Sequence, residues 1–586
     1  MPKRLASRLV IATTILALTP LLAPAPATAQ GVSGPYLAAE HAARRGDISE
    51  AARLYARVLA RDPENIRLME QTMLHQVAAG QVAQAVVIAR KLDRMVPGHH
   101  LGVLILAADG LKAEKYHKVR ELLETGGPDG GPFVGTVIEA WADFGDGDTE
   151  RAYALLDTLE SDGTGGPIGK ILAAYHAGLI GAASEDDEKA LSAFARAAGE
   201  SSNGGTNRLI RAQAGALARQ GQLEEAQALL DERIALSRGA PRLERLAEAL
   251  DAGDLPAPIS TTPEQGAAEA LFAISGYVAR GNNRLIGLAY ARLATYLDPG
   301  LVEAQLLIGD ILAQDEQYGL AIEAYARIPE VAPEAIDAEI GRAQALQDAD
   351  EVDEGLGVLR ELVARHEDSV EAHTALGDML RMTKRYSDAA KAFDGAIALI
   401  GEPEQRNWVL FYRRGIAYER SKQWEKAEAD FKTALELEPD QPLVLNYLGY
   451  SWVEMGSHLE EAQKMIERAV DQRPDDGYIV DSLGWVLYRV GKFEEALGHM
   501  ARAVELNPSD PVINDHYGDV LWVNGRKLEA RFQWRRALSF APEEDEINRI
   551  RRKLDVGLDL VLEEEAAGQD AALLGTADEP KEGNGG

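Results

Sequence analysis

Residues 481–508 read DSLGWVLYRVGKFEEALGHMARAVELNP and decide the fold. Gly484 stands inside a helical pattern, although a glycine in the middle of a helix costs about 1 kcal/mol relative to alanine. The stretch at 514–542, NDHYGDVLWVNGRKLEARFQWRRALSFAP, and the stretch at 446–474, NYLGYSWVEMGSHLEEAQKMIERAVDQRP, carry the same glycine with similar neighbours. The glycine is therefore part of a repeat.

The repeat has a fixed spacing of small residues. Gly484 is followed twelve positions later by Ala496, then by Ala503 and by Pro508. Two further units keep a period of 34 residues, and a third, at 442–476, has one extra residue before its alanines. One of the two regular units carries Gly518, Ala530, Ala537 and Pro542, and the other carries Gly415, Ala427, Ala434 and Pro439. In the third unit the alanines are Ala462 and Ala469.

This pattern resembles the tetratricopeptide repeat, which has a period of 34 residues and a Leu-Gly, aromatic, Ala, Phe, Pro order. The resemblance implies an all-α fold, a right-handed α-solenoid of helix-turn-helix repeats. We expect the glycine of the first helix and the alanine of the second to lie where the two helices cross most closely. Proline then ends the second helix, because it lacks the backbone donor that a continuing helix needs.

The same frame divides the chain. Weaker units begin at 268, 302, 336 and 370, which predicts a regular array of about seven repeats over 267–544. A capping helix at 545–565 and a disordered acidic tail at 566–586 follow. Upstream, the weaker pattern over residues 30–250 predicts irregular helical repeats with Gly-rich turns. The proline-containing stretch 251–266 is the expected linker.

Composition restricts the classes of function. The chain has 94 acidic and 61 basic residues, a net charge of −33, and no cysteine. Such a charge repels nucleic-acid phosphates, so we expect no nucleic-acid partner. The missing cysteine excludes disulfides, thiolate metal sites and a lipid-modified cysteine.

The N-terminus has the three regions of a secretory signal peptide. A basic start precedes an apolar run at 9–22, and Ala27-Thr28-Ala29 supplies a small-x-small cleavage site. The alternative is a membrane anchor, but the run is shorter than the roughly 20 residues that span a bilayer and prolines interrupt it. We expect residues 1–29 to be removed and the mature chain to be exported to the periplasm, with no transmembrane segment.

Motifs for chemistry are weak. The stretch TGGPIGKI at 164–171 lacks the first glycine and the final Ser or Thr of a phosphate loop, and a helix-to-helix turn explains it better. His99-His100 has no third ligand at a recognisable spacing. Paired glutamates recur at the start of second helices, where the helix dipole favours them. We expect no catalytic, cofactor or metal site.

The tetratricopeptide resemblance implies a binding groove instead. In that family the second, fifth, ninth and twelfth positions of the first helix face the inner groove, and here they hold aromatic and polar residues that suit a protein partner. Packing between neighbouring helices explains Trp485 and Trp522 equally well. The candidate protein-binding residues are Tyr412, Asn446, Tyr450, Tyr478, Asp481, Trp485, Tyr488, Asp515, Asp519 and Trp522.

The run at 445–538, together with PISTTPEQGAAEALFAIS at 258–275, is similar to exported bacterial envelope solenoids. That group includes an outer-membrane lipoprotein adaptor that presents peptidoglycan hydrolases to a carboxyl-terminal processing protease. The resemblance implies a non-catalytic periplasmic adaptor with protein partners of that kind. This chain lacks the adaptor's lipidated cysteine. The alternative is a structural component of an envelope assembly or polysaccharide-export system.

Overall fold

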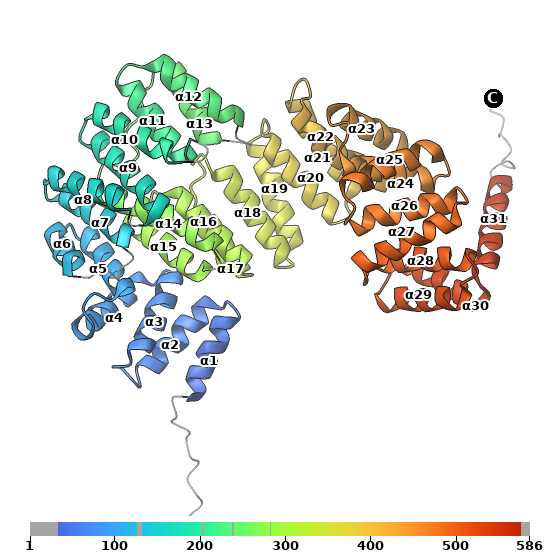
Figure 1. The fold of residues 1–586 in the computed structure, drawn as a ribbon, viewed down its shortest axis with the longest axis horizontal. Coiled ribbons are helices and arrows are strands. Elements are labelled where there is room, and N and C mark those ends of the chain that lie inside the picture. The colour runs from blue at the N-terminus through green and yellow to red at the C-terminus, as the bar shows by residue number, and fades with distance from the viewer. Residues whose placement is uncertain are drawn as a thin grey trace, which may run out of the picture. The chain divides into compact units, whose positions relative to one another are not determined.

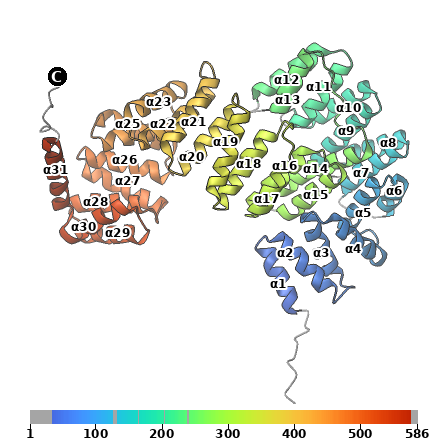
Figure 2. The same ribbon diagram turned by 180° about the vertical axis from the view of Figure 1, so that it is seen from behind.

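The computed structural model describes residues 33–125, 132–163, 165–201, 204–236, 240–281 and 283–575. Every regular element in these ranges is a helix, and consecutive helices pair into hairpins that stack along the chain (Figures 1 and 2). The expected all-α solenoid of tetratricopeptide-type repeats is confirmed. The expected signal peptide at 1–29 lies outside the described residues.

The chain forms two compact units, residues 1–338 and 339–586. The helices of the first unit are α1 (Ser33–Arg44), α2 (Ile48–Leu59), α3 (Ile66–Ala78), α4 (Val82–Met95), α5 (His100–Lys112), α6 (Tyr116–Thr125), α7 (Pro132–Gly145), α8 (Thr149–Asp162), α9 (Gly166–Ala183), α10 (Asp187–Gly199), α11 (Asn207–Arg219), α12 (Leu223–Leu236), α13 (Pro241–Asp251), α14 (Pro263–Arg280), α15 (Arg284–Leu297), α16 (Val302–Gln314) and α17 (Tyr318–Tyr325).

The boundary between the units falls inside α18 (Ala335–Asp348). The second unit continues with α19 (Val352–Arg365), α20 (Val370–Met382), α21 (Tyr386–Leu399), the short 3-10 helix η1 (Gln405–Asn407), α22 (Trp408–Arg420), α23 (Trp424–Leu437), α24 (Pro442–Glu454), α25 (Leu459–Gln472), α26 (Gly477–Arg489), α27 (Phe493–Leu506), α28 (Pro511–Val523), α29 (Lys527–Ser539), α30 (Glu544–Val556) and α31 (Leu558–Gly575).

The repeat glycine makes room for a large side chain. A β-carbon placed on Gly484 would lie 2.9 Å from Cγ of Met500, and one placed on Gly518 would lie 2.4 Å from Cδ1 of Trp534. Gly415 faces Phe431 at 2.6 Å in the same way. In these hairpins the glycine therefore packs against a bulky residue of the second helix, and the repeat alanines Ala496 and Ala530 are fully buried. The bulky residue that the glycine faces lies sixteen positions along the chain.

The turn inside each hairpin also repeats. Seven residues after the motif glycine, the backbone enters the left-handed region, with φ of 82° at Gly491 and 78° at Gly525. Glycine adopts this conformation without a steric penalty and ends the first helix. The backbone N–H groups of Lys492 and Arg526 then donate to carbonyls five residues earlier, which closes each turn.

In the first unit, the hairpin α14–α15 packs onto helices that are distant in sequence. Helix α14 contacts α5, α7 and α9, and α15 contacts α3, α4 and α5, so the hairpin lies against the first helices of several earlier pairs (Figures 1 and 2). A β-carbon on Gly266 of α14 would lie within 1.9 Å of the buried ring of Trp141. The face that an open solenoid would leave free is filled here by the chain itself.

Buried polar contacts fix this hairpin. Glu269 of α14, only 2 % exposed, accepts a hydrogen bond from Tyr175 Oη at 3.0 Å and one from Arg208 Nε at 2.5 Å. On α7, the indole N–H of Trp141 donates to Nδ1 of His176 at 2.9 Å. Because α14 belongs to this core, the boundary differs from the expected linker at 251–266. That stretch includes the last residue of α13, the connection at 252–262 and the first turn of α14, all within the first unit.

The C-terminal cap consists of two helices, whereas the sequence predicted one at 545–565. Helices α30 and α31 are separated by Gly557, whose φ of 90° breaks the helix. A β-carbon on Gly557 would lie 2.4 Å from the ring of Trp522, so the break also permits close packing on α28. Helix α31 runs through the start of the predicted tail, and residues 576–586 of that tail lie outside the described residues.

Candidate protein-binding site

Two adjoining hollows lie on the second unit where α24, α26 and α28 pack side by side. The smaller has a volume of about 430 Å³ and the larger about 790 Å³. Tyr450, Glu454 and Val512 line both, so the hollows form one continuous surface, which we call the groove. It is a concave face of the kind by which solenoids bind extended partners.

The smaller hollow combines exposed apolar area with carboxylates. Tyr478 is 59 % exposed and Met455 is 47 % exposed, and both line it. Its acidic lining residues are Glu419, Glu454, Asp481 and Asp510. Asn446 also lines the hollow, and its buried Oδ1 has no hydrogen-bond partner among the described residues. This hollow therefore offers aromatic rings, negative charge and a spare acceptor.

The larger hollow contains a stack of aromatic rings. The ring of Trp485 lies 4.0 Å from that of His516 at an angle of 13°, and 4.9 Å from that of Tyr488 at 21°. The indole N–H of Trp485 donates to Oε1 of Glu454 at 2.5 Å. In contact with these two rings, Trp485 is only 7 % exposed. Its role is to hold neighbouring side chains in place, and it offers a partner little area of its own.

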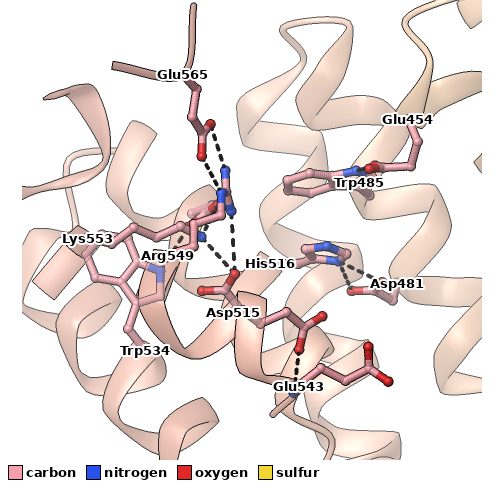
Figure 3. A network of polar contacts seen from close by, with 12 residues as sticks. Glu454, Asp481, Trp485, Asp515, His516, Trp534, Glu543, Arg549, Lys553 and Glu565 are labelled. Carbon is pink, nitrogen blue, oxygen red and sulfur yellow. Dashed lines mark hydrogen bonds and ion pairs between the residues drawn. The ribbon is translucent and has the colours of Figure 1, made fainter. Parts of the chain in front are cut away.

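A buried lysine from the cap neutralises two aspartates on α28 (Figure 3). Nζ of Lys553, which is 0 % exposed, lies 2.7 Å from Oδ2 of Asp515 and 2.7 Å from both carboxylate oxygens of Asp519. The indole N–H of Trp534 donates to Asp519 at 2.9 Å. Burial, and then the charge of Asp519, raises the pKa of Asp515 despite the lysine. The cluster ties α28 to α30.

His516 bridges this cluster and α26. Its Nδ1 lies 2.9 Å from Oδ2 of Asp481, and both residues are buried. Burial acts to lower the pKa of His516, but the charge and hydrogen bond of Asp481 outweigh it, so the pKa is raised above its ordinary value. The imidazole of His516 is stacked on Trp485 and faces the carboxylate of Asp481 inside the groove (Figure 3).

Helix α31 closes one end of the larger hollow. Arg549 of α30 bonds Oε1 of Glu565 at 2.7 Å and lies 3.5 Å from Asp519. Leu562 and Glu565 of α31 line the hollow opposite Trp485. The sequence did not indicate the roles of Lys553 and Arg549. The only signal was the basic run INRIRRKL, which has no counterpart in the preceding repeats.

The structure brings together seven of the ten predicted residues. Those lining the hollows are Asn446, Tyr450, Tyr478, Asp481, Trp485, Tyr488 and Asp515. Tyr412 packs instead among Trp408, Phe431 and Tyr447, with ring centroids 6.0–6.2 Å away. Asp519 lies beneath the hollow in the lysine cluster.

Trp522 occupies the core of the cap. Its ring is 6 % exposed and lies 5.2 Å from that of Trp534, and it lines neither hollow. Trp522 therefore packs between helices and does not face the groove. The second cap helix covers the face of α28 that would otherwise line the groove. Whether any of these residues contacts a partner stays a prediction.

The described ranges show no sign of a metal centre. They contain no group of three or more His, Asp or Glu side chains placed to hold a metal. His99 contacts Glu70 at 2.8 Å, and His100 contacts the Tyr290 hydroxyl at 3.1 Å, so the two imidazoles point to different partners. None of the helices in these ranges is long and apolar enough to span a bilayer.

Models of the tetratricopeptide repeat match residues 340–403, 408–441 and 482–544. The chain contains tetratricopeptide repeats. It is 27 % identical over 194 residues to TPR repeat-containing protein PA4667 of Pseudomonas aeruginosa, covering 33 % of this chain and 32 % of that protein. It is also 27 % identical over 185 residues to tetratricopeptide repeat protein 13 of Homo sapiens, covering 31 % and 21 %. The chain thus spans a third or less of each relative's length.

Among solved structures, the crystal structure of the APC/C hetero-tetramer Cut9-Hcn1 matches with a TM-score of 0.38 and 13 % identity, covering 90 % of this chain and 97 % of that one. The crystal structure of YrrB, a TPR protein with an unusual peptide-binding site, matches with a TM-score of 0.26 and 18 % identity. That match covers 32 % of this chain and 93 % of YrrB.

Proposed function

We propose that this protein is a non-catalytic adaptor that binds an extended segment of a partner protein in the groove of its second unit. The observation that carries the proposal is the continuous surface formed by the two hollows, with Tyr450, Glu454 and Val512 shared between them. Exposed aromatic side chains give large contact area at a low cost in conformational entropy. Tetratricopeptide repeats are scaffolds for protein–protein interaction, which supports this assignment.

The lining chemistry favours a partner segment that carries a cation beside an apolar anchor. Four carboxylates line the smaller hollow, against the single basic residue Arg420. Lys or Arg on the partner would meet Glu419 and Asp510, while an apolar side chain would contact Tyr450 and Tyr478. In the first unit, the α14–α15 hairpin packs against α3, α5, α7 and α9, on the face that corresponds to the groove.

The proposed setting is the bacterial periplasm. The signal-peptide pattern of residues 1–29 supports export. The resemblance of residues 445–538 to exported envelope solenoids, a group that includes a protease adaptor, supports a role between a carboxyl-terminal processing protease and clients such as peptidoglycan hydrolases. Two partners held on one scaffold gain effective concentration. The alternative, a structural component of an envelope assembly or polysaccharide-export system, uses the same groove for a permanent partner.

A crosslinked pull-down of the mature chain from its own cell envelope tests both readings. The variant changes Tyr478→Ala and Met455→Glu, two exposed lining residues whose loss leaves the core intact. Tyr277→Ala, at an exposed tyrosine of the first unit, is the matched control.

Recovery of a processing protease or its clients by the native chain and the control, but not by the groove variant, supports the adaptor. Recovery of export or assembly components in that pattern favours the alternative. Equal recovery with all three chains would refute binding in the groove.

A further inference from the structure

A separate cavity in the first unit, of about 360 Å³, is lined by basic and neutral residues only. It lies between the turn after α3 and the helices α15, α16 and α17, where Gly80, Tyr296 and Gln305 form part of its wall. Its charged lining residues are Arg292 and Arg327. The chain has 94 acidic residues against 61 basic ones, yet no carboxylate in the described ranges lines this cavity.

Arg292 is buried without an ion pair, and Glu323 is the only carboxylate among the charges that act on its pKa. Its residue is 9 % exposed, and its Nε donates to the carbonyl oxygen of Ala78 at 3.3 Å. Within the described ranges no carboxylate oxygen lies within ion-pair distance of it. Burial, and then the nearby charge of Arg327, lowers the pKa of Arg292 to about 10. A guanidinium has five N–H donors, so this single backbone contact leaves most of them unused.

Other deeply placed arginines of this chain are paired. Arg208 bonds Glu269, and Arg414 lies 2.7 Å from Asp430. Burying a charge without a partner is costly, so the pairing of these two arginines is what physical chemistry predicts. Arg292 departs from that pattern. The carbonyl oxygen of Ala78, the last residue of α3, accepts a hydrogen bond from Nε of Arg292. The two terminal amines of Arg292 stay available to a ligand.

Arg327 supplies a second positive charge at the mouth. Its side chain is 59 % exposed, and its Nη2 lies 3.9 Å from Oε2 of the equally exposed Glu323, a long pair that water screens. The rest of the wall includes the apolar residues Val82, Pro299 and Val302. The cavity thus combines a buried guanidinium fork, a second cation and apolar walls, at a volume in the range of small-molecule sites.

We propose that this cavity binds a small anionic ligand, an oxyanion head of carboxylate or phosphate type on a compact apolar body. Arg292 binds two oxygens of the head through its planar fork, a geometry that guanidinium groups favour. Arg327 adds charge from the mouth, and the apolar wall contacts the ligand body. The site is independent of the groove in the second unit, and it gives the chain a means of sensing or carrying a small acid.

Isothermal titration calorimetry of the full mature chain in an anion-poor buffer tests this site. The probes are benzoate, phenyl phosphate and inorganic phosphate, which distinguish a carboxylate head, a phosphate head and a head without an apolar body. We expect Arg292→Met to weaken binding about ten- to a hundredfold, the worth of a charge-assisted contact. Arg292→Lys keeps the charge but loses the fork and should be intermediate.

Two further variants keep the result interpretable if Arg292→Met folds poorly. Arg327→Gln changes an exposed side chain and should weaken binding at least about fivefold. Arg280→Gln removes the same charge from an exposed position outside the cavity and should leave binding unchanged. Absence of heat with all three probes at millimolar concentration would overturn the proposal, as would equal affinity in the Arg327→Gln and Arg280→Gln chains.

Discussion

The substitution Gly518→Ala measures how tightly the two helices of the last repeat pack. Its new β-carbon would lie 2.4 Å from Cδ1 and Nε1 of Trp534, where ordinary contact begins at 3.4 Å. Trp534 is fully buried, and its N–H is bonded to Asp519, so the ring must move by roughly 1 Å. Overpacking of this kind costs about 1–3 kcal/mol and a strained hydrogen bond about 1 kcal/mol more, against a gain of about 1 kcal/mol in helix propensity. We expect net local destabilisation of about 1–3 kcal/mol.

Two other glycines serve as controls. Gly498 of α27 has no atom within 4 Å of its β-carbon position, so Gly498→Ala should stabilise its helix by about 0.5–1 kcal/mol. A β-carbon on Gly484 would lie 2.9–3.1 Å from Cγ, Cε and Sδ of the buried but flexible Met500, so Gly484→Ala should destabilise less than Gly518→Ala.

Hydrogen exchange read by mass spectrometry is the right assay, because solenoid stability is local. Amides of 511–539 should exchange faster in the first variant. Unchanged or slower exchange there, or faster exchange at 493–506 in Gly498→Ala, would refute the packing argument.

Three further substitutions test the charged contacts. Lys553→Met leaves Asp515 and Asp519 with only the longer contacts to Arg549, at 3.5–3.7 Å, and should cost about 3 kcal/mol, seen as lost exchange protection over 544–575. Folding raises the pKa of His516 above its unfolded value, which is near 6.5. The stabilisation that His516 provides is therefore complete at pH values below 6.5 and is lost as the pH rises through the pKa of the folded state. Unfolding midpoints of the second unit should fall over that window, and Asp481→Asn should abolish or reverse the trend. Glu269→Gln removes a carboxylate from Arg208 and should lower the thermal midpoint of the first unit by an amount equivalent to about 3 kcal/mol, whereas an unchanged midpoint would contradict its role in holding α14.

The period of the sequence predicted the helical hairpins because each repeat carries its own turn and packing signals. Gly491 and Gly525 mark the left-handed turns of two repeats, and Lys422 adopts the same conformation at that position of the repeat that contains Gly415. What the period could not predict is packing between distant repeats. The residues around Gly266 do not indicate that it packs against Trp141, which lies 125 positions earlier in the chain. A contact between residues so far apart does not affect the local spacing of the repeat. For this reason the boundary between the two units lies at residue 338, whereas the sequence predicted a linker at 251–266.

The candidate site was predictable to the extent that it lies on regular repeats. Tyr450 and Tyr478 occupy family groove positions, and both line the smaller hollow. Prediction was weakest at the end of the array. There, the cap supplies Lys553 and covers Trp522, which in an internal repeat would have faced the groove. The cap lies outside the repeat pattern, so the spacing of the repeats does not predict its contacts.

The two units meet the same physical problem in different ways, since a solenoid leaves its inner face unpaired. The first unit covers that face with α14–α15 and matches its buried carboxylate, Glu269, to Arg208. The second covers only one end, with the cap, and leaves Glu419 and Asp510 lining an uncovered hollow without an ion pair among the described contacts. A partner segment with lysine or arginine would complete this arrangement. Because these carboxylates are solvated in the free chain, its affinity should fall as salt is raised from about 50 to 500 mM. A salt-independent affinity would instead assign recognition to the aromatic rings alone.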